Sequence, residues 1–350
     1  MTHAEASTPA LELGLDTFAD LMEGPDKKPC SYAETLRNVV EQAAHADALG
    51  LDFFGVGEHH RDDFAASAPE IVLAAIASRT KRIRLGTAVT VLSSDDPVRV
   101  FERFATLDAV SSGRAEIIVG RGSFTESFPL FGYDLAQYNE LFEEKLDLLS
   151  ALLREGPVSW HGSVRAALDD QHVYPKTEKG RIRTWVGVGG SPESVVRAAG
   201  YGFPMVLAII GGPPARFLPF VELYRRALRE MGSAELPVAV HSPGFVADTD
   251  EEAKTLLWPH HKKLFDRVGG ERGWPPLTRE RFEADVAHGA LHVGSPETVA
   301  QKIASTVRTL GLSRFQLKYA SGSVPHATLM RTIELYATKV APRVRELLAT

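Results

Sequence analysis

The fold is indicated most clearly by residues 83–122, which read IRLGTAVTVLSSDDPVRVFERFATLDAVSSGRAEIIVGRG. The stretch contains two apolar, β-branched runs, at 83–91 and 115–119. Between them, Pro97 suits the first turn of a helix, where the backbone N–H that proline lacks has no partner anyway. The apolar runs alternate little with polar residues, as in parallel strands that are covered on both faces. The stretch therefore predicts a strand–helix–strand unit of a parallel sheet.

The same succession of strand and helix patterns runs along the whole chain. Ser31 and Glu34, for example, have the spacing of a capping box at the start of a helical pattern that stops at Gly50. Eight strands are expected, at residues 11–18, 52–56, 83–91, 115–119, 184–188, 205–210, 238–240 and 314–319. Eight strands with helices between them predict a (β/α)₈ TIM barrel, and an open doubly wound sheet is the alternative.

The 350 residues are expected to form a single domain, 1–350, built on this barrel. Two segments, at about 155–182 and 250–293, are too long for simple loops. We expect both to be insertions at the C-terminal face of the barrel, where lids and binding loops lie. Pro342 is expected to kink or interrupt the last helix, because proline removes a backbone donor and its ring clashes with the preceding turn.

Composition excludes several classes of function. The 39 basic and 45 acidic residues give a formal net charge of -6 without a basic tract, which argues against nucleic acid or an anionic membrane as partner. The single cysteine, Cys30, excludes an intramolecular disulfide and a zinc site of several thiolates. No apolar run approaches the ~18 residues of a membrane helix, and the first ten residues lack the features of a signal peptide. We expect a soluble, cytoplasmic enzyme with a small-molecule substrate.

Two glycine-rich motifs at expected strand ends are suited to holding an anion. Residues 187–194, GVGGSPES, lead from a strand into a helix start, whose free N–H groups favour negative charge. The candidate ligands there are Gly189, Gly190, Ser191 and Ser194. An ordinary turn with a serine cap explains this motif equally well. Arg121 and Gly122 follow the neighbouring expected strand, where an arginine can fork onto the same phosphate, and a surface salt bridge is the alternative.

Glu58, His59 and His60 follow another expected strand. His59 is the candidate catalytic residue, because an imidazole can transfer a proton or hydrogen-bond a reactive oxygen, and a buried structural histidine is the alternative. Adjacent histidines point in different directions, so metal binding is the weaker functional interpretation. A metal-dependent hydrolase using Glu58, His59 and His241 is kept as a minor alternative. No G-x-S-x-G motif is present, and Cys30 has no evident base, so nucleophilic catalysis has no support.

Several motifs, in their order along the chain, resemble those of the bacterial-luciferase-like flavin-dependent monooxygenases. They are IRLGTAV at 83–89, DPVR at 96–99, LD at 107–108, SGR at 112–114 and GRG at 120–122, together with GEHH at 57–60, GFPM at 202–205 and PH at 325–326. The resemblance covers roughly residues 11–347.

The resemblance implies a barrel, usually dimeric, that binds FMN at its C-terminal face. Carried over by position, Arg121 with Gly190, Ser191 and Ser194 holds the FMN phosphate. Ala88 and Val89 match the place where the family often has a cis peptide bond against the flavin ring, and His59 matches the histidine of its flavin–oxygen chemistry. The candidate pocket residues are Phe18, Glu58, His60, Phe124 and Tyr138.

The function implied is that of a two-component monooxygenase. A separate flavin reductase delivers reduced FMN, which is used with O2 to oxidise a small organic substrate, and a homodimer without a metal is expected. An F420-dependent reductase or dehydrogenase on the same fold is the main alternative, and a non-enzymatic barrel subunit is the last.

Overall fold

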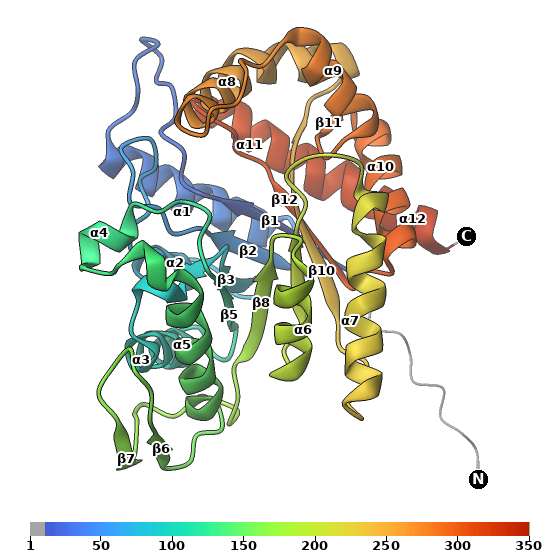
Figure 1. Cartoon of the computed structure of the whole chain (residues 1–350). Helices are drawn as coiled ribbons and strands as arrows, with labels where there is room; N and C mark the ends of the chain where they lie inside the picture. The colour runs from blue at the N-terminus through green and yellow to red at the C-terminus, as the bar shows by residue number, and fades with distance from the viewer. Residues whose placement is uncertain (1–10, 350) are drawn as a thin grey trace.

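In the computed structural model, which describes residues 11–349, eight parallel strands close into a barrel (Figure 1). In order around the barrel they are β1 (Glu12–Thr17), β2 (Phe53–Val56), β3 (Arg84–Thr87), β5 (Ala115–Gly120), β8 (Arg183–Val188), β9 (Met205–Ala208), β10 (Val238–Val246) and β12 (Arg314–Lys318). The short β4 (Thr90–Val91) extends the wall beside β5, and β12 pairs with β1 to complete the ring. The (β/α)₈ prediction is thus confirmed, and the open sheet is excluded.

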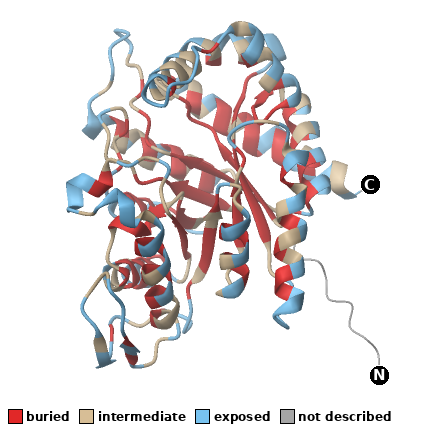
Figure 2. Cartoon of the chain, viewed as in Figure 1, coloured by how far each residue is buried: buried red, intermediate tan, exposed pale blue. Residues whose placement is uncertain are grey.

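Helices form the outer layer and turn their apolar faces to the barrel, so burial is concentrated in the strands and the inner helix faces (Figure 2). They are α1 (Tyr32–Ala48), α2 (Pro69–Ala77), α3 (Pro97–Val110), α4 (Ser127–Phe131), α5 (Tyr138–Leu152), α6 (Pro192–Gly200), α7 (Leu218–Glu230), α10 (Pro296–Leu310) and α11 (His326–Leu335). The predicted cap of the first helix is present, because the Ser31 hydroxyl accepts the N–H of Glu34 at 3.2 Å. Pro97 opens α3 as expected, next to the capping carboxylate of Asp96.

The predicted interruption near Pro342 is confirmed. The chain leaves α11 through a wide π-turn at Tyr336–Val340 and continues as α12 (Ala341–Ala349). In a continuous α-helix the Pro342 ring would clash with the carbonyl four residues before it, and the wide turn avoids that clash.

The segment at 155–182 corrects one expectation. It contains an antiparallel pair, β6 (Val158–Trp160) and β7 (Leu168–Gln171), and leads from the end of α5 to the start of β8. A segment that follows a helix and precedes a strand must return to the amino ends of the strands. Figure 1 accordingly shows β6 and β7 at the opposite end of the molecule from α8 (Asp250–Glu271) and α9 (Arg279–His288), so this segment is not at the C-terminal face.

The segment at 250–293 does lie at the C-terminal face, because it follows β10. It is helical rather than a loop and consists of α8 (Asp250–Glu271), α9 (Arg279–His288) and β11 (His292–Gly294), which pairs with the outer part of β10.

The floor of the barrel interior is a buried ionic layer. Nη1 and Nη2 of Arg314 donate to the two carboxylate oxygens of Glu116, at 2.7 and 2.9 Å, and both side chains are fully buried. Arg84, Arg183 and Glu12 complete the layer. Burial alone would raise the pKa of Glu116, but Arg314, Arg183 and Arg84 outweigh it and lower that pKa to about 2. The next layer is apolar and comprises Phe53, Ile118, Trp185, Val206 and Ala239.

Replacing Glu116 by Gln should lower the free energy of unfolding by about 3–5 kcal/mol, because Arg314 keeps its charge and loses its buried partner. Urea unfolding at pH 7 measures this loss. Glu297→Gln, which breaks the exposed pair with Arg343, is the control and should cost less than about 1 kcal/mol. Equal small losses would contradict the account.

The ionised Glu116 should also make the free energy of unfolding depend on pH. Its contribution to that free energy should be complete above its ordinary pKa of 4.5 and should disappear as the pH falls towards 2.

Candidate active site at the carboxyl ends of the strands

The rim where the strands end carries two kinds of side chain. The ends of β1, β2, β10 and β12 bear titratable groups, namely Asp16, His59, His241 and Lys318. The strands β3, β5 and β8 end in the small residues Thr87, Gly120 and Val188, and Arg121 directly follows β5. A Cβ added to Gly120 would come within 2.7 Å of Val89, and one added to Gly187 within 3.2 Å, whereas at Gly189 it would meet nothing within 4 Å. The second half of the rim is therefore a flat apolar wall with open space at Gly189.

The predicted cis peptide bond is present between Ala88 and Val89, at the edge of this wall. The peptide N–H of Ala88 donates to the carbonyl of Val56, so β2 holds the segment on one side.

His59 lies in an aromatic cluster. Its ring centroid is 4.5 Å from Phe18, 4.5 Å from Phe64 and 4.9 Å from Phe124. Burial, helped by the positive charges of Lys318, Arg61 and His60, lowers the pKa of His59 to about 3. The imidazole is therefore neutral at physiological pH and is a weak proton acceptor, although it can still donate or accept a hydrogen bond.

Glu58 and His60 brace the cis segment. One carboxylate oxygen of Glu58 accepts the N–H of Val91 at 2.8 Å, and the other lies 2.9 Å from His60 Nε2. The backbone N–H of Glu58 also bonds the carbonyl of Val89. Both oxygens of Glu58 are thus occupied by the protein, and we assign this pair to positioning of the rim rather than to substrate contact.

Arg121 lies at the end of β5, where its guanidinium is only partly engaged. Nη1 donates to the Asn139 side chain at 2.7 Å, and the guanidinium stands 5.2 Å from the ring of Tyr138. The Tyr138 hydroxyl donates to the carbonyl of Gly122 at 2.5 Å, and its ring stacks on Phe128. Tyr138, expected to line the pocket, therefore supports Arg121 and the turn at Gly122.

Ser191 caps α6. Its hydroxyl accepts the N–H of Ser194 at 3.3 Å, and the Ser194 hydroxyl donates back to the carbonyl of Ser191 at 2.8 Å. Gly190, with φ of +101°, makes the turn that precedes the cap. The backbone N–H of Ser191 has no protein acceptor within residues 11–349.

A second copy of this cap shows what the geometry prefers. Residues 294–297 repeat the GSPE of 190–193, and Ser295 caps α10 in the same way, with Thr298 in the place of Ser194. Here a carboxylate occupies the helix end, since Asp250 accepts the N–H of Ser295 at 2.6 Å and the hydroxyl of Thr298 at 3.0 Å. Burial on its own raises the pKa of Asp250, but these bonds outweigh it and leave the pKa below its ordinary value. The cap thus stabilises an anion, and in the described part of the chain no carboxylate bonds the corresponding groups of α6.

The α8 segment covers the rim on the side of β2 and β5. Near the end of α8, Glu271 receives both Nη1 and Nη2 of Arg61 at 2.7 Å. Arg272 donates to the carbonyl of Ser123 at 2.9 Å and lies over Phe124. At the other side of the rim, His261 in α8 bonds the Ser321 hydroxyl after β12.

Sequence reasoning missed three groups at the rim and gave His241 a chemical role only in the metal-dependent alternative, although it placed His241 near the end of a strand. Asp16 Oδ2 lies 2.8 Å from His241 Nδ1, and Lys318 Nζ lies 3.3 Å from Asp20 Oδ2 and 4.5 Å from the centroid of Phe18. Their signal in the sequence is slight, because Asp16 and Lys318 are each one of two charged residues in a mostly apolar strand run, beside Glu12 and Arg314, and Asp20 lies outside both runs.

The metal-dependent alternative loses its support. Within residues 11–349, no group of three or more His, Cys, Asp or Glu side chains is arranged to hold a metal ion. In the same range, no helix has both the length and the apolar character needed to cross a bilayer.

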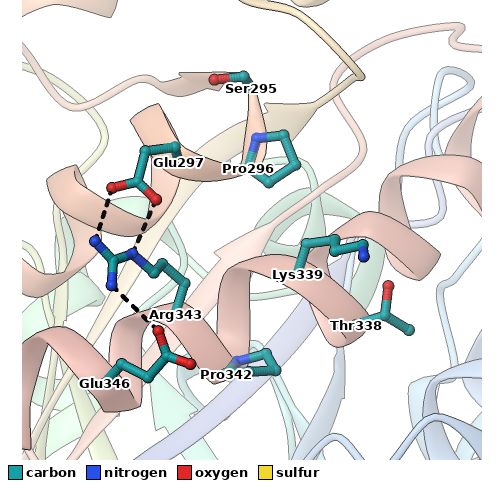
Figure 3. A pocket seen from close by; sticks show the side chains of 8 residues that line it. All are labelled: Ser295, Pro296, Glu297, Thr338, Lys339, Pro342, Arg343 and Glu346. Atoms are coloured by element: carbon teal, nitrogen blue, oxygen red, sulfur yellow. Dashed lines mark hydrogen bonds and ion pairs between the residues drawn. The ribbon is translucent and has the colours of Figure 1, made fainter.

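A surface hollow between α10 and α12 lies away from this rim (Figure 3). Three of its charged groups pair with one another, because Arg343 bonds Glu297 at 2.9 and 3.2 Å and Glu346 at 3.1 Å (Figure 3). The fourth, Lys339, makes no hydrogen bond or ion pair within residues 11–349, and a single exposed lysine does not make a binding site.

A parallel barrel whose catalytic-type groups collect at the carboxyl ends of its strands is the architecture of a TIM-barrel enzyme. A family model described as luciferase-like monooxygenase matches residues 16–314, so the chain belongs to the luciferase-like monooxygenase family and is a flavin-type oxidoreductase. It is 37% identical to 4-hydroxyprotoasukamycin monooxygenase of Streptomyces nodosus subsp. asukaensis, over 87% of this chain and 85% of that protein. It is 24% identical to the alkanal monooxygenase alpha chain of Photobacterium leiognathi, over 90% and 95% of the two chains.

Solved structures share the fold at lower sequence identity. Monooxygenase RslO1 from Streptomyces bottropensis superposes with a TM-score of 0.82 at 24% identity, covering 95% of this chain and 99% of that one. The oxygenating constituent of 3,6-diketocamphane monooxygenase from Pseudomonas putida, a structure in complex with FMN, has a TM-score of 0.77 at 23% identity, covering 96% and 99%. An F420-dependent secondary alcohol dehydrogenase has a TM-score of 0.72 at 18% identity, again covering 96% and 99%.

Proposed function

We propose that this chain is the oxygenase component of a two-component monooxygenase that uses reduced FMN and O2 to oxidise a small organic substrate. When bound, reduced FMN supplies the electrons that activate O2, and this chain's residues bind the flavin, orient it and exclude water. The chain offers no dinucleotide-binding fingerprint of its own, so a separate flavin reductase is the proposed source of reduced FMN. A homodimer is part of the same proposal.

The observation that carries the proposal is the difference between the two serine caps. Both helices carry a glutamate in the first turn, but at α10 Asp250 also accepts the N–H of the capping serine, whereas at α6 no carboxylate among residues 11–349 accepts the N–H of Ser191. The free N–H of Ser191, the hydroxyls of Ser191 and Ser194 and the positive end of the helix dipole are the donors that a phosphate needs.

Arg121 strengthens this interpretation. It stands at the end of β5, which pairs in parallel with β8, the strand that leads into Ser191. Only one of its guanidinium nitrogens has a protein acceptor within residues 11–349. The remaining N–H groups are available to fork onto a phosphate held at α6.

The wall formed by Val89, Gly120 and Gly187 suits a planar ring. Side chains larger than hydrogen are impossible at Gly120 without moving Val89, so the wall stays flat. His59 and Phe18 lie on the other half of the rim, where their rings contact each other at 4.5 Å, and we assign that half to the substrate.

An F420-dependent reductase or dehydrogenase remains the competing function, because two of the solved relatives of this fold depend on F420. Both cofactors carry a phosphate, so the cap at α6 does not separate them. The monooxygenase is favoured by the relative of 37% identity, whose name describes a monooxygenase.

Titration of the purified chain with FMN, reduced FMN and F420, followed by fluorescence and equilibrium dialysis, distinguishes the two functions. We expect FMN or its reduced form to bind at micromolar concentration and F420 to bind more weakly. Binding of F420 alone would replace the monooxygenase proposal by the F420-dependent one.

The two caps provide a matched pair of variants. Ser191→Ala and Ser295→Ala should each lower helix stability by about 1 kcal/mol, since each removes one N-cap. Only Ser191→Ala should also weaken FMN binding, by about tenfold, because a hydrogen bond to a charged group contributes about 1.5–3 kcal/mol. Isothermal titration calorimetry with FMN measures the difference. If both variants bind FMN equally well, Ser191 is only a helix cap.

A further inference from the structure

Asp16 and His241 form a buried pair in the wall of the barrel. His241 Nδ1 lies 2.8 Å from Asp16 Oδ2, and Asp16 is completely buried. The His241 ring stacks on Phe18, at a centroid distance of 5.8 Å and an angle of 13°. Because Phe18 also contacts His59, the pair belongs to the same side-chain cluster as the predicted catalytic histidine.

The contact with Asp16 decides which nitrogen of His241 is available. A buried carboxylate accepts the Nδ1–H, which leaves a lone pair on Nε2. Within residues 11–349, Nε2 has no hydrogen-bond partner, and it is not among the unpartnered polar atoms that are sealed from solvent. His241 therefore has a proton acceptor that solvent can reach, and Asp16 fixes the orientation of its ring.

Two further polar atoms beside this pair lack a partner. Asp16 Oδ1 and Gln316 Nε2 are buried without a hydrogen bond in the described part of the chain. Gln316 lies opposite His241 on one side and opposite Gly14, two residues before Asp16, on the other. Buried polar groups without partners are rare and are concentrated at functional sites.

His59 does not compete for the same task. Burial and the nearby positive charges keep its pKa near 3, so it is a poor acceptor of a substrate proton. Lys318 is engaged by Asp20 and by the carbonyl of Ala320, so its ammonium supplies a fixed positive charge beside Phe18 rather than a base.

The walls next to the pair are aromatic. Phe18 and Phe64 are 5.9 Å apart, and Phe64 and Phe124 are 6.2 Å apart, in edge-to-face arrangements. Such a wall packs well against an aromatic ring.

We propose that Asp16 and His241 are the proton-accepting pair of the proposed monooxygenase and that its substrate is an aromatic ring bearing an ionisable hydroxyl. His241 is the catalytic residue, and Asp16 is a positioning residue. In the step proposed, the substrate O–H bond breaks and its electron pair stays on oxygen, while the proton forms a new N–H bond at Nε2. Asp16 keeps its bond to Nδ1 and stabilises the positive charge that develops on the ring. The resulting aryloxide makes the ring a stronger electron donor, as ring oxidation requires.

The test uses 4-nitrophenol as the probe, because its aryloxide absorbs visible light and its neutral form does not. The full chain without flavin is titrated with the probe at a pH one unit below the probe's own pKa. Binding to the wild type should produce the aryloxide band. His241→Gln should lower the bound aryloxide-to-phenol ratio by about tenfold or more, the equivalent of one pKa unit. Asp16→Asn should give an intermediate ratio, because an amide still accepts the Nδ1–H but carries no charge.

His288→Gln, at the exposed end of α9, is the control and should behave as the wild type. FMN affinity is measured on every variant, since a misfolded protein would lose it together with the band. A wild type that fails to bind the probe or binds it without the band, or a His241→Gln variant that keeps the band, overturns the inference. If the wild type gives the aryloxide band but does not bind FMN, the monooxygenase proposal is refuted and the proton-accepting role of the pair stands. If the wild type binds FMN but gives no aryloxide band, the proposed role of the pair is refuted and the monooxygenase proposal stands.

Discussion

Closure of eight parallel strands into one ring is the constraint on which this molecule depends, since it brings the carboxyl end of every strand to the same rim. Side chains must then fill the interior of the barrel at the amino ends of the strands. Arg314 and Glu116 form the floor, and a layer around Trp185 lies on top of it. With the lower part of the barrel packed in this way, chemistry is confined to the upper rim. Function in this fold is accordingly set by what the strand ends and the loops after them carry.

The rim is divided, and the division accounts for the proposed chemistry. One half is flat and apolar around Val89 and Gly120, next to the start of α6, where the N–H of Ser191 has no acceptor among residues 11–349. The other half holds neutral His59, the Asp16–His241 pair and the Lys318–Asp20 pair. We propose that the apolar half takes the flavin and that the half with the titratable groups takes the substrate. The α8 segment, held by Arg61 and Arg272, shields the junction between them.

Local signals made most of the fold predictable. The capping box at Ser31, the proline at 97 and the interruption at Pro342 act within one or two helical turns, so they can be read without knowing the tertiary structure. The length of 155–182 suggests a lid, whereas its place between a helix and a strand puts it at the amino ends of the strands.

The residues that hold the candidate site together are harder to predict from the sequence. Asp16 and His241 are 225 positions apart, and only the closed barrel brings them into contact.

The central claim is that the free start of α6, together with Arg121, binds the phosphate of FMN. Riboflavin has the same ring system and side chain without the phosphate, so comparing the two ligands on the unmodified chain isolates that group. Calorimetric titration at fixed salt should show FMN binding at least about tenfold more tightly than riboflavin, since a charge-assisted contact to phosphate contributes about 1.5–3 kcal/mol. Equal affinities would show that the phosphate is not recognised and would contradict the account.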